Sequence, residues 1–438
     1  MKPFAIKDKF IPCGRIRVAG DKSIAHRALI ISALSCGKTI INNFPVHDDS
    51  LATLSVLSAL GVKIASDNKQ VSVWGVQRLK KPSKPVFVNN SGTTLRLILG
   101  VLAGTGFKTK LIAGKYLSNR PMARVNKPLR LMGAKITAKS RSGEEYPPLV
   151  ISGGNLKGIL YRMPVASAQV KSAILLAGLS ALGKTRVIES ISTRDHTERM
   201  LKSFGANITV NKNSITLTPD PDRGLISPGR IYIPGDISSA AFLAVLAVII
   251  PGAKIVIERV SLNPSRCGII NVLKRMGAKI KVTPFKNKKA QSFEPMGNLT
   301  VSSGKLKAIV INHSEVPSLI DELPVLMVAA CFAEGRTIIK GAGELRFKET
   351  DRINSMISNL RPMGAQICSI KSGGLENIVI KGKGFLNGAK LKSFGDHRTA
   401  MSMVVAALAA KGSSRLDDIS CISKSFPGFL TTLKDLLR

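Results

Sequence analysis

Side chains that could act as acids, bases or anion ligands gather in short segments of this chain. The densest is Lys348-Glu349-Thr350-Asp351-Arg352, which combines two cationic groups with two carboxylates. Positioned carboxyl groups transfer protons, while guanidinium and ammonium groups bind phosphate or carboxylate. On a helix, Lys348 and Arg352 would share one face, and the alternative reading is a salt-bridged helix surface. The preceding Gly341-Ala342-Gly343 turn does not complete a dinucleotide fingerprint, because position 346 is an arginine.

Three other segments, far apart in the chain, are versions of one another: Gly20-Asp21-Lys22-Ser23, Gly235-Asp236-Ile237-Ser238 and Gly395-Asp396-His397-Arg398. Each follows a β-prone stretch and opens an apolar helix. The first N–H groups of a helix have no partner within the helix, so they attract anions and capping side chains. Because Lys22, Ser238 and Arg398 differ in chemistry, we expect the three copies to have separate roles.

Further polar residues stand at other expected helix starts. They lie in Asn89-Asn90-Ser91-Gly92-Thr93-Thr94, Arg120-Pro121-Met122-Ala123-Arg124, Ser167-Ala168-Gln169 and Asp321-Glu322. Ser23 and Arg27 are four residues apart and can share a helix face with Lys22. Helix capping alone explains any one of these segments. Together they predict a cleft surrounded by N–H groups and by the positive ends of helix dipoles.

Repeated elements must position these residues. The glycines Gly61, Gly133, Gly205 and Gly277 are each 72 residues apart, and Gly364 follows after 87. Each ends an expected helix and precedes a β-prone run, and a sixth copy would occupy Phe429 to the C-terminus. Repeats of mixed elements at this period indicate six α/β units of about 70 residues.

Another set of glycines is expected to end six apolar helices, because glycine adopts a left-handed conformation without strain: Gly37, Gly104, Gly183, Gly252, Gly335 and Gly412. We predict an α/β protein of two similar domains with three units each, the chain crossing twice between them. The domains are 20–235 and 1–19 plus 236–438, with the active site in the cleft between them.

Composition excludes several classes of protein. The longest apolar run, Ala240 to Pro251, is too short for the roughly 20 residues of a membrane span, and we expect neither a signal peptide nor a membrane partner. Scattered cysteines, with Cys36 and Cys331 in apolar helix patterns, predict reduced core thiols in a cytoplasmic protein. The histidines show no metal-ligand spacing, so we expect no metal and no cofactor.

The net charge of +38 at pH 7, from 65 Lys and Arg against 27 Asp and Glu, could serve nucleic-acid binding. The basic residues are spread over the chain and aromatic residues are only 5%, which disfavours a base-stacking surface. We therefore expect a lysine-rich surface, with Lys286 to Lys289 in a solvated loop, and no nucleic-acid partner. A basic nucleic-acid-binding protein remains the alternative from another class.

The segments quoted above, in this order and at these intervals, resemble the 5-enolpyruvylshikimate-3-phosphate synthase family over essentially the whole chain. The resemblance implies the enolpyruvyl transferase fold, an inside-out α/β barrel in each domain, and usually a monomer. It also implies transfer of the enolpyruvyl group of phosphoenolpyruvate to the 5-hydroxyl of shikimate 3-phosphate, through a tetrahedral intermediate and with release of phosphate. Both substrates carry phosphate and carboxylate groups.

The resemblance assigns roles to matching residues. Those that would bind shikimate 3-phosphate are Lys22, Ser23, Arg27, Ser167, Ala168, Gln169, Arg194, Asp321 and Lys348. Those that would bind phosphoenolpyruvate are Lys22, Asn90, Gly92, Arg120, Gln169, Arg352, Arg398 and Lys424. Asp321 would accept the hydroxyl proton, Glu349 would protonate the methylene carbon, and Lys22 would assist the proton transfers. Ser238 receives no role.

Some residues depart from the best-known members. Ser167-Ala168-Gln169 replaces Ser-Ser-Gln, and Glu344 replaces an asparagine, so the chain looks closer to the second bacterial class. Gly92, where glyphosate-tolerant members often have alanine, argues against tolerance. The competing enzyme is UDP-N-acetylglucosamine enolpyruvyl transferase, which shares fold and donor. That family usually has a loop cysteine where this chain has Lys115, and Lys348-Glu349-Thr350-Asp351-Arg352 also disfavours it.

Overall fold

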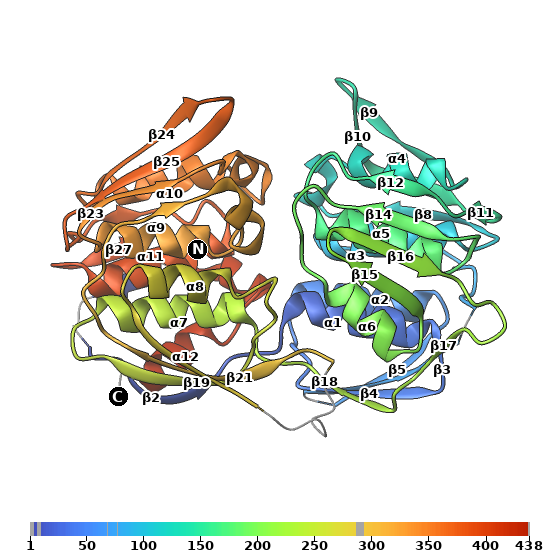
Figure 1. Cartoon of the computed structure of the whole chain (residues 1–438), viewed down its shortest axis with the longest axis horizontal. Coiled ribbons are helices and arrows are strands. Elements are labelled where there is room, and N and C mark those ends of the chain that lie inside the picture. The colour runs from blue at the N-terminus through green and yellow to red at the C-terminus, as the bar shows by residue number, and fades with distance from the viewer. Residues whose placement is uncertain (1–3, 7–9, 68, 77, 286–292, 437–438) are drawn as a thin grey trace. The chain divides into compact units, whose positions relative to one another are not determined.

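The computed structural model describes the chain except for residues 1–3, 7–9, 68, 77, 286–292 and 437–438 (Figure 1). The described residues form two compact units. The N-terminal unit comprises Gly20–Ile233 together with Phe293 and Glu294. The C-terminal unit comprises the described parts of Met1–Ala19, Pro234–Asn287 and Pro295–Arg438. The expected loop at Lys286 to Lys289 lies outside the described residues.

The N-terminal unit contains these helices: α1 (Lys22–Ala33), α2 (Asp48–Ala59), α3 (Gly92–Ala103), η1 (Leu117–Asn119), α4 (Ala123–Leu131), α5 (Ala168–Gly178) and α6 (His196–Ser203). Its first four-stranded sheet is β18 (Arg230–Tyr232), β4 (Lys38–Asn42), β6 (Gln70–Trp74) and β5 (Lys63–Asp67). The second is β7 (Val86–Phe87), β8 (Lys108–Ile112), β10 (Glu144–Ser152) and β9 (Lys135–Arg141). The third is β12 (Leu160–Arg162), β14 (Thr185–Ile188), β16 (Ser214–Thr218) and β15 (Asn207–Asn211). Two small sheets pair β17 (Leu225–Ile226) with β3 (Ser35–Cys36) and β11 (Leu156–Lys157) with β13 (Ala181–Leu182).

The C-terminal unit contains these helices: α7 (Ile237–Ile249), α8 (Gly268–Arg275), η2 (His313–Ser318), α9 (Leu323–Cys331), η3 (Gly343–Phe347), α10 (Arg352–Leu360), α11 (His397–Ala409), η4 (Ser420–Lys424) and α12 (Phe429–Leu436). One four-stranded sheet is β2 (Cys13–Arg17), β19 (Lys254–Ser261), β21 (Met296–Ser302) and β20 (Lys279–Pro284). The other is β22 (Val310–Ile311), β23 (Gly335–Ile339), β25 (Leu375–Gly382) and β24 (Gln366–Ser372). A three-stranded sheet is β1 (Phe4–Ile6), β27 (Ser414–Leu416) and β26 (Lys390–Leu391).

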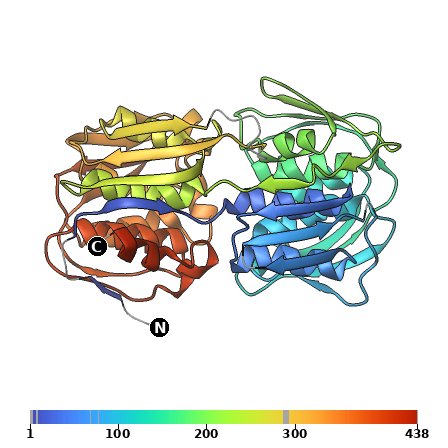
Figure 2. The same ribbon diagram turned by 90° about the horizontal axis from the view of Figure 1, so that it is seen from below.

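All five four-stranded sheets share one pattern. The first strand pairs parallel with the second, and the remaining pairs are antiparallel, as in β18-β4-β6-β5. The sheet of β2 follows the same order, so an N-terminal strand is hydrogen-bonded into the C-terminal unit. Figure 2 shows this blue strand beside the yellow-green strand β19. A strand from the first 19 residues is thus paired with a strand from the second half of the chain.

The repeated Gly-Asp segments begin helices as the sequence predicted. Asp21, Asp236 and Asp396 are the N-caps of α1, α7 and α11, and each carboxylate accepts backbone N–H groups of the first turn. Every residue of α7 is buried, which agrees with its continuous apolar sequence. The helices α1, α3 and α5 supply much of one apolar core, and α7, α9 and α11 much of the other. These buried helices hold their N-terminal residues in fixed positions.

The two glycine sets behave differently. Gly61, Gly133, Gly205 and Gly277 directly follow the C-caps of α2, α4, α6 and α8 and have positive φ angles, as expected for helix ends. The expectation that the second glycine set directly ends six apolar helices was wrong in detail. The apolar helix α1 ends at Ala33, and Gly37 lies beyond β3 in the turn to β4. Of that set Gly104 is a C-cap, but its φ of −85° is not left-handed.

Two local expectations also need correction. Lys348, Glu349 and Thr350 precede α10 rather than forming part of it, because Asp351 caps that helix from outside. Cys36 is exposed in β3, not a core residue of a helix, whereas Cys331 is buried in α9. None of the helices in the described part of the chain has the length and apolar character to cross a membrane.

Candidate active site

The predicted site residues fall into two groups, one in each unit. The N-terminal site group is Lys22, Ser23, Arg27, Asn90, Gly92, Arg120, Ser167, Ala168, Gln169 and Arg194. The C-terminal site group is Asp321, Lys348, Glu349, Arg352, Arg398 and Lys424. Within each unit, the residues come from the N-terminal ends of buried helices and from the loops beside them.

In the N-terminal site group, the first turns of α1 hold Lys22, Ser23 and Arg27 close together. The Arg27 guanidinium donates to the backbone oxygen of Ser23 at 2.8 Å, to Thr197 Oγ1 at 2.7 Å and to Ser172 Oγ at 2.8 Å. Burial lowers the pKa of Arg27 to about 10, so the side chain stays cationic at neutral pH. A fixed, partly desolvated guanidinium of this kind is suited to phosphate.

Lys22 has a partner that the sequence did not reveal. Its ammonium donates to Asp49 Oδ2 at 2.9 Å, and both side chains remain about a fifth exposed. Burial would raise the pKa of Asp49, but the charge and the hydrogen bond of Lys22, with contributions from neighbouring groups, together outweigh burial and keep that pKa below its ordinary value. Asp49 is therefore an anion that orients the Lys22 ammonium.

A second cluster joins α3, α5 and the loop before α4. Arg96 Nη1 donates to Gln169 Oε1 at 3.0 Å, and Gln169 Nε2 donates to Thr93 Oγ1 at 2.9 Å. A Cβ atom added at Gly92 would lie 2.7 Å from Arg96 Nη1 and 3.0 Å from Arg120 Nη1. The absent side chain at Gly92 thus lets two guanidinium groups approach the start of α3.

The remaining N-terminal residues have structural partners at the same helix starts. The Asn90 side-chain oxygen accepts the backbone N–H groups of Tyr116 and Leu117, which fixes the loop before Arg120. Ser167 caps α5 through Val170 N at 3.4 Å, and Ala168 is the first residue of that helix. Arg194 lies near enough to Arg27 for its charge to oppose protonation there.

In the C-terminal site group, Arg352 contacts three carboxylates. Its guanidinium lies 2.8 Å from Asp396 Oδ2 and 3.4 Å from Asp321 Oδ1, and it also donates to Glu349 Oε2. Burial alone would lower the pKa of Arg352, but these carboxylates raise it above its ordinary value. Asp396 is fully buried, whereas Asp321 and Glu349 are partly exposed. The two exposed carboxylates therefore flank one permanent cation.

Two further cations of this group, Arg398 and Lys348, lie near Asp321, and Lys424 lies at the start of α11. Arg398 Nη1 donates to the backbone oxygen of Asp321 at 3.1 Å, and Arg398 Nε lies 3.6 Å from Asp321 Oδ1. Loss of hydration lowers the pKa of Lys348, with Asp321 and Glu344 opposing that shift. Lys424 Nζ lies 3.5 Å from the Gly395 oxygen, at the start of α11. The arrangement can bind an anion beside two carboxylates.

Sequence reasoning missed the residues that hold the predicted ones. Asp49, Arg96, Ser172 and Thr197 contact Lys22, Gln169 and Arg27 from other helices. Arg96 offered one signal, because it lies four residues after Gly92 and so on the same helical face. Asp49 offered no such signal, because acidic residues are common in the first turn of a helix, where Asp48 and Asp49 of α2 lie.

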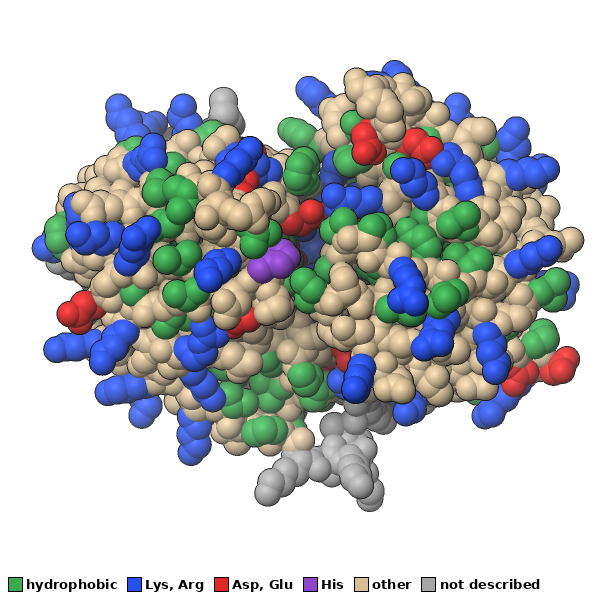
Figure 3. Space-filling model, turned by 45° about the horizontal axis from the view of Figure 1, so that its top comes forward, with side chains coloured by type: hydrophobic (Ala, Val, Ile, Leu, Met, Phe, Trp, Pro, Cys, Tyr) green, Lys and Arg blue, Asp and Glu red, His purple; other side chains and the backbone are tan. Residues whose placement is uncertain are grey.

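Lys and Arg side chains are numerous on the molecular surface. Figure 3 shows them scattered over the visible face of each unit without a single dominant patch. A distributed positive field attracts small anions to the whole molecule.

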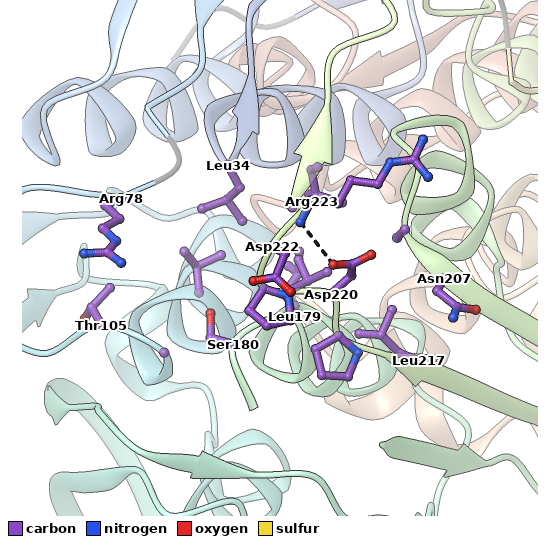
Figure 4. A pocket seen from close by; sticks show the side chains of 18 of the residues that line it. Leu34, Arg78, Thr105, Leu179, Ser180, Asn207, Leu217, Asp220, Asp222 and Arg223 are labelled. Carbon is purple, nitrogen blue, oxygen red and sulfur yellow. Dashed lines mark hydrogen bonds between the residues drawn. The ribbon is translucent and has the colours of Figure 1, made fainter. Parts of the chain in front are cut away.

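A cavity of about 660 Å³ lies elsewhere in the N-terminal unit (Figure 4). Leu34, Gly104 and Leu179 place it at the C-terminal ends of α1, α3 and α5, and Asp220 to Arg223 form part of its rim. Lys22, Gly92 and Ala168 begin these same helices, so they lie about 17 Å from the cavity along helices of this length. The cavity is therefore not the site considered above.

The chain is similar to known proteins over nearly its whole length. A family model described as EPSP synthase (3-phosphoshikimate 1-carboxyvinyltransferase) matches residues 13–433. The 3-phosphoshikimate 1-carboxyvinyltransferase of Syntrophomonas wolfei is 46% identical over 426 residues, with 97% of each chain covered. The one from Geobacter sp. strain M21 is 45% identical over 428 residues, again with 97% of each covered. A solved structure of EPSP synthase from Acinetobacter baumannii has a TM-score of 0.87 and 40% identity, covering 100% of this chain and 98% of the other.

Proposed function

The chain belongs to the EPSP synthase family, and we infer from this membership that it transfers the enolpyruvyl group of phosphoenolpyruvate to the 5-hydroxyl of shikimate 3-phosphate. The products are 5-enolpyruvylshikimate 3-phosphate and phosphate. The enzyme is a 3-phosphoshikimate 1-carboxyvinyltransferase of the shikimate pathway, which serves aromatic amino acid biosynthesis.

The N-terminal site group binds the anionic ends of both substrates. Lys22, Ser23 and Arg27 hold the phosphate of shikimate 3-phosphate, together with Ser167, Ala168 and Arg194. Asn90, Gly92 and Arg120 bind phosphoenolpyruvate, and Gln169 contacts both substrates. The interlocked hydrogen bonds of Arg27 and of Gln169 support this assignment, because they fix donors before a substrate arrives.

The C-terminal site group supplies the proton transfers. Asp321 accepts the proton of the 5-hydroxyl, whose oxygen attacks C2 of phosphoenolpyruvate while Glu349 protonates C3. In the second step C3 loses a proton and the C2–O bond to phosphate breaks, so the double bond reforms and phosphate leaves. Lys22 assists these transfers, Lys348 binds the shikimate side, and Arg352, Arg398 and Lys424 balance the charge of the leaving phosphate.

One observation carries the assignment of acid and base. Asp321 and Glu349, both partly exposed, contact the same buried guanidinium of Arg352. A general base and a general acid must reach opposite ends of one reacting unit, and a shared cation fixes the distance between them. Arg352 then binds the substrate anion with the same group that positions both carboxylates.

The finer family features are part of the same proposal. Each domain has three repeated α/β units, with the bounds 20–235 and 1–19 plus 236–438, and the chain passes twice between domains. The enzyme acts as a monomer in the cytoplasm, without metal or cofactor and without a nucleic-acid partner. The shared strand order of the five four-stranded sheets supports the repeat.

The test is a phosphate-release assay with phosphoenolpyruvate as the donor, run with shikimate 3-phosphate, with UDP-N-acetylglucosamine and without an acceptor. We expect release with shikimate 3-phosphate, and none without an acceptor or with UDP-N-acetylglucosamine. Release with the nucleotide sugar alone would support the competing enzyme. Absence of release together with strongly salt-dependent binding to duplex DNA would support the nucleic-acid alternative.

A further inference from the structure

The Gly235-Asp236 copy of the repeated helix start has no role in the reaction described above. Asp236 Oδ1 accepts the backbone N–H of Ser238 at 2.9 Å, so the segment caps α7. Ser238 is only 1% exposed, and its hydroxyl is engaged by the side chains of Arg266 and Glu322. Any role of Ser238 in the reaction must therefore act through its neighbours.

Those neighbours are charged and equally buried. Arg266 Nη2 donates to Ser238 Oγ at 2.6 Å, and the Ser238 hydroxyl donates to Glu322 Oε1. Arg266 Nη2 also lies 3.5 Å from Asp236 Oδ1 and 3.6 Å from Glu322 Oε1. Glu322 is 0% exposed and Arg266 is 1% exposed. Charges withdrawn from water this far persist only where they are paired and hydrogen-bonded.

The cluster reaches the reaction site through Arg398. Arg398 Nη1 lies 4.0 Å from Glu322 Oε1 and donates to the backbone oxygen of the adjacent Asp321. Asp236 and Glu322 carry two negative charges, and Arg266 and Arg398 carry two positive ones. Without the Glu322 charge, the Arg266 and Arg398 cations would face each other with one buried anion fewer between them.

We propose that Glu322 is a positioning residue for phosphoenolpyruvate, which holds the Arg398 guanidinium in place while Ser238 and Arg266 hold Glu322. The inference rests on the proposed function, in which Arg398 binds that substrate. It gives the second Gly-Asp segment a purpose, because Ser238 anchors the carboxylate behind the site. It also separates two adjacent acids, with Asp321 facing the reaction and Glu322 facing the core.

The Gly20-Asp21 copy of the repeat also lies beside an arginine whose guanidinium is held in place, but by different groups. Arg27 is held by the neutral oxygens of Ser23, Ser172 and Thr197. Arg398, in contrast, has a buried carboxylate behind it. Replacing Glu322 by glutamine therefore changes the electrostatic field at Arg398, while the size and shape of the side chain at position 322 stay nearly the same.

The experiment measures kcat and both KM values by phosphate release for the wild type, Glu322→Gln, Glu322→Asp and Ser238→Ala. We expect Glu322→Gln to raise the KM for phosphoenolpyruvate about tenfold, and to change that for shikimate 3-phosphate less than about twofold. Glu322→Asp should restore part of the loss, and Ser238→Ala should raise the same KM about threefold. Ser239→Ala is the matched control, because Ser239 is 3% exposed in the same helical turn.

A purely structural role predicts a different result, namely a lower thermal midpoint with both KM values unchanged. That result for Glu322→Gln would overturn the inference, as would equal increases in both KM values. If Glu322→Gln does not fold, Ser238→Ala decides, and an unchanged KM for phosphoenolpyruvate in that variant would contradict the proposal. Failure of the wild type to release phosphate would instead contradict the proposed function.

Discussion

Arg352 is the residue on which the charges of the C-terminal site group converge. It contacts Asp321, Glu349 and Asp396 at once, and it is 1% exposed. Despite burial, the neighbouring carboxylates raise the pKa of Arg352 above its ordinary value, so the side chain is cationic at neutral pH. One buried cation therefore fixes the position of the two partly exposed carboxylates.

Replacing either carboxylate by its amide tests the assigned proton transfers. We expect Asp321→Asn and Glu349→Gln each to lower kcat by about 10²–10⁴-fold, because a positioned acid or base contributes that much. Steady-state phosphate release provides the measurement. Glu258→Gln, which alters an exposed ion pair with Arg15 and Arg17, is the control and should retain activity. Normal turnover by either site variant would remove that residue from the mechanism.

Gly92 makes a residue-scale prediction of its own. Gly92→Ala places a methyl group 2.7 Å from Arg96 Nη1 and 3.0 Å from Arg120 Nη1, so both guanidinium groups must move. We expect the KM for phosphoenolpyruvate to rise several-fold, and inhibition by glyphosate to weaken relative to the wild type. Inhibition curves for the two proteins measure this. Gly106→Ala, where a Cβ meets nothing within 4 Å, should change neither value.

At the scale of elements, helices α1 and α2 are coupled through buried histidines. His26 Nδ1 of α1 lies 2.6 Å from Thr53 Oγ1 of α2, and the His47 side chain caps α2. Burial lowers the pKa of His26 from 6.5 to about 3 and that of His47 to about 4. Both imidazoles are therefore neutral in the folded protein at neutral pH.

This burial predicts acid sensitivity of the fold. As the pH falls below 6.5, these histidines become protonated in the unfolded chain but stay neutral in the folded chain. The free energy of unfolding therefore falls by up to about 1.4 kcal/mol per pH unit for each histidine. The loss begins near pH 6.5 and continues to about pH 4 for His47 and about pH 3 for His26. Urea denaturation from pH 7 to 4.5 measures the slope.

His26→Gln should flatten that slope even if it lowers stability at pH 7. Replacing the exposed His313 should leave the slope unchanged. An identical slope in wild type and His26→Gln would show that His26 is not the titrating group.

The elements also show which features could be predicted from sequence. The caps Asp21, Asp236 and Asp396 and the glycines after α2, α4, α6 and α8 were predictable, because a cap or a positive φ depends on neighbouring residues. The ends of the apolar helices and the exposure of Cys36 were not, since packing rather than local pattern decides them. Contacts across the chain were equally hidden: the partners of Lys22, Gln169 and Arg27 lie 27, 73 and 170 residues away.

At the scale of the whole molecule, the charge of +38 is the unusual property. Because both substrates are anions, a positive field should increase their encounter with the protein. We expect kcat/KM for each substrate to fall several-fold as ionic strength rises from about 0.01 M to about 0.3 M, where screening shortens the Debye length from about 30 Å to under 10 Å. Rates measured in sodium chloride series test this. Constant kcat/KM over the series would show that the surface charge does not assist catalysis.

The central claim is enolpyruvyl transfer with Glu349 as the acid at the methylene carbon. The most direct measurement runs the reaction in D₂O and determines phosphate and the product by mass spectrometry. Protonation of C3 from an exchangeable carboxyl group makes a transient methyl group, so deuterium must enter the methylene of the product. The account predicts one phosphate for each 5-enolpyruvylshikimate 3-phosphate formed and deuterium in its enolpyruvyl group, with both signals greatly reduced in Glu349→Gln. Phosphate release without this product, or a product free of deuterium, would contradict it.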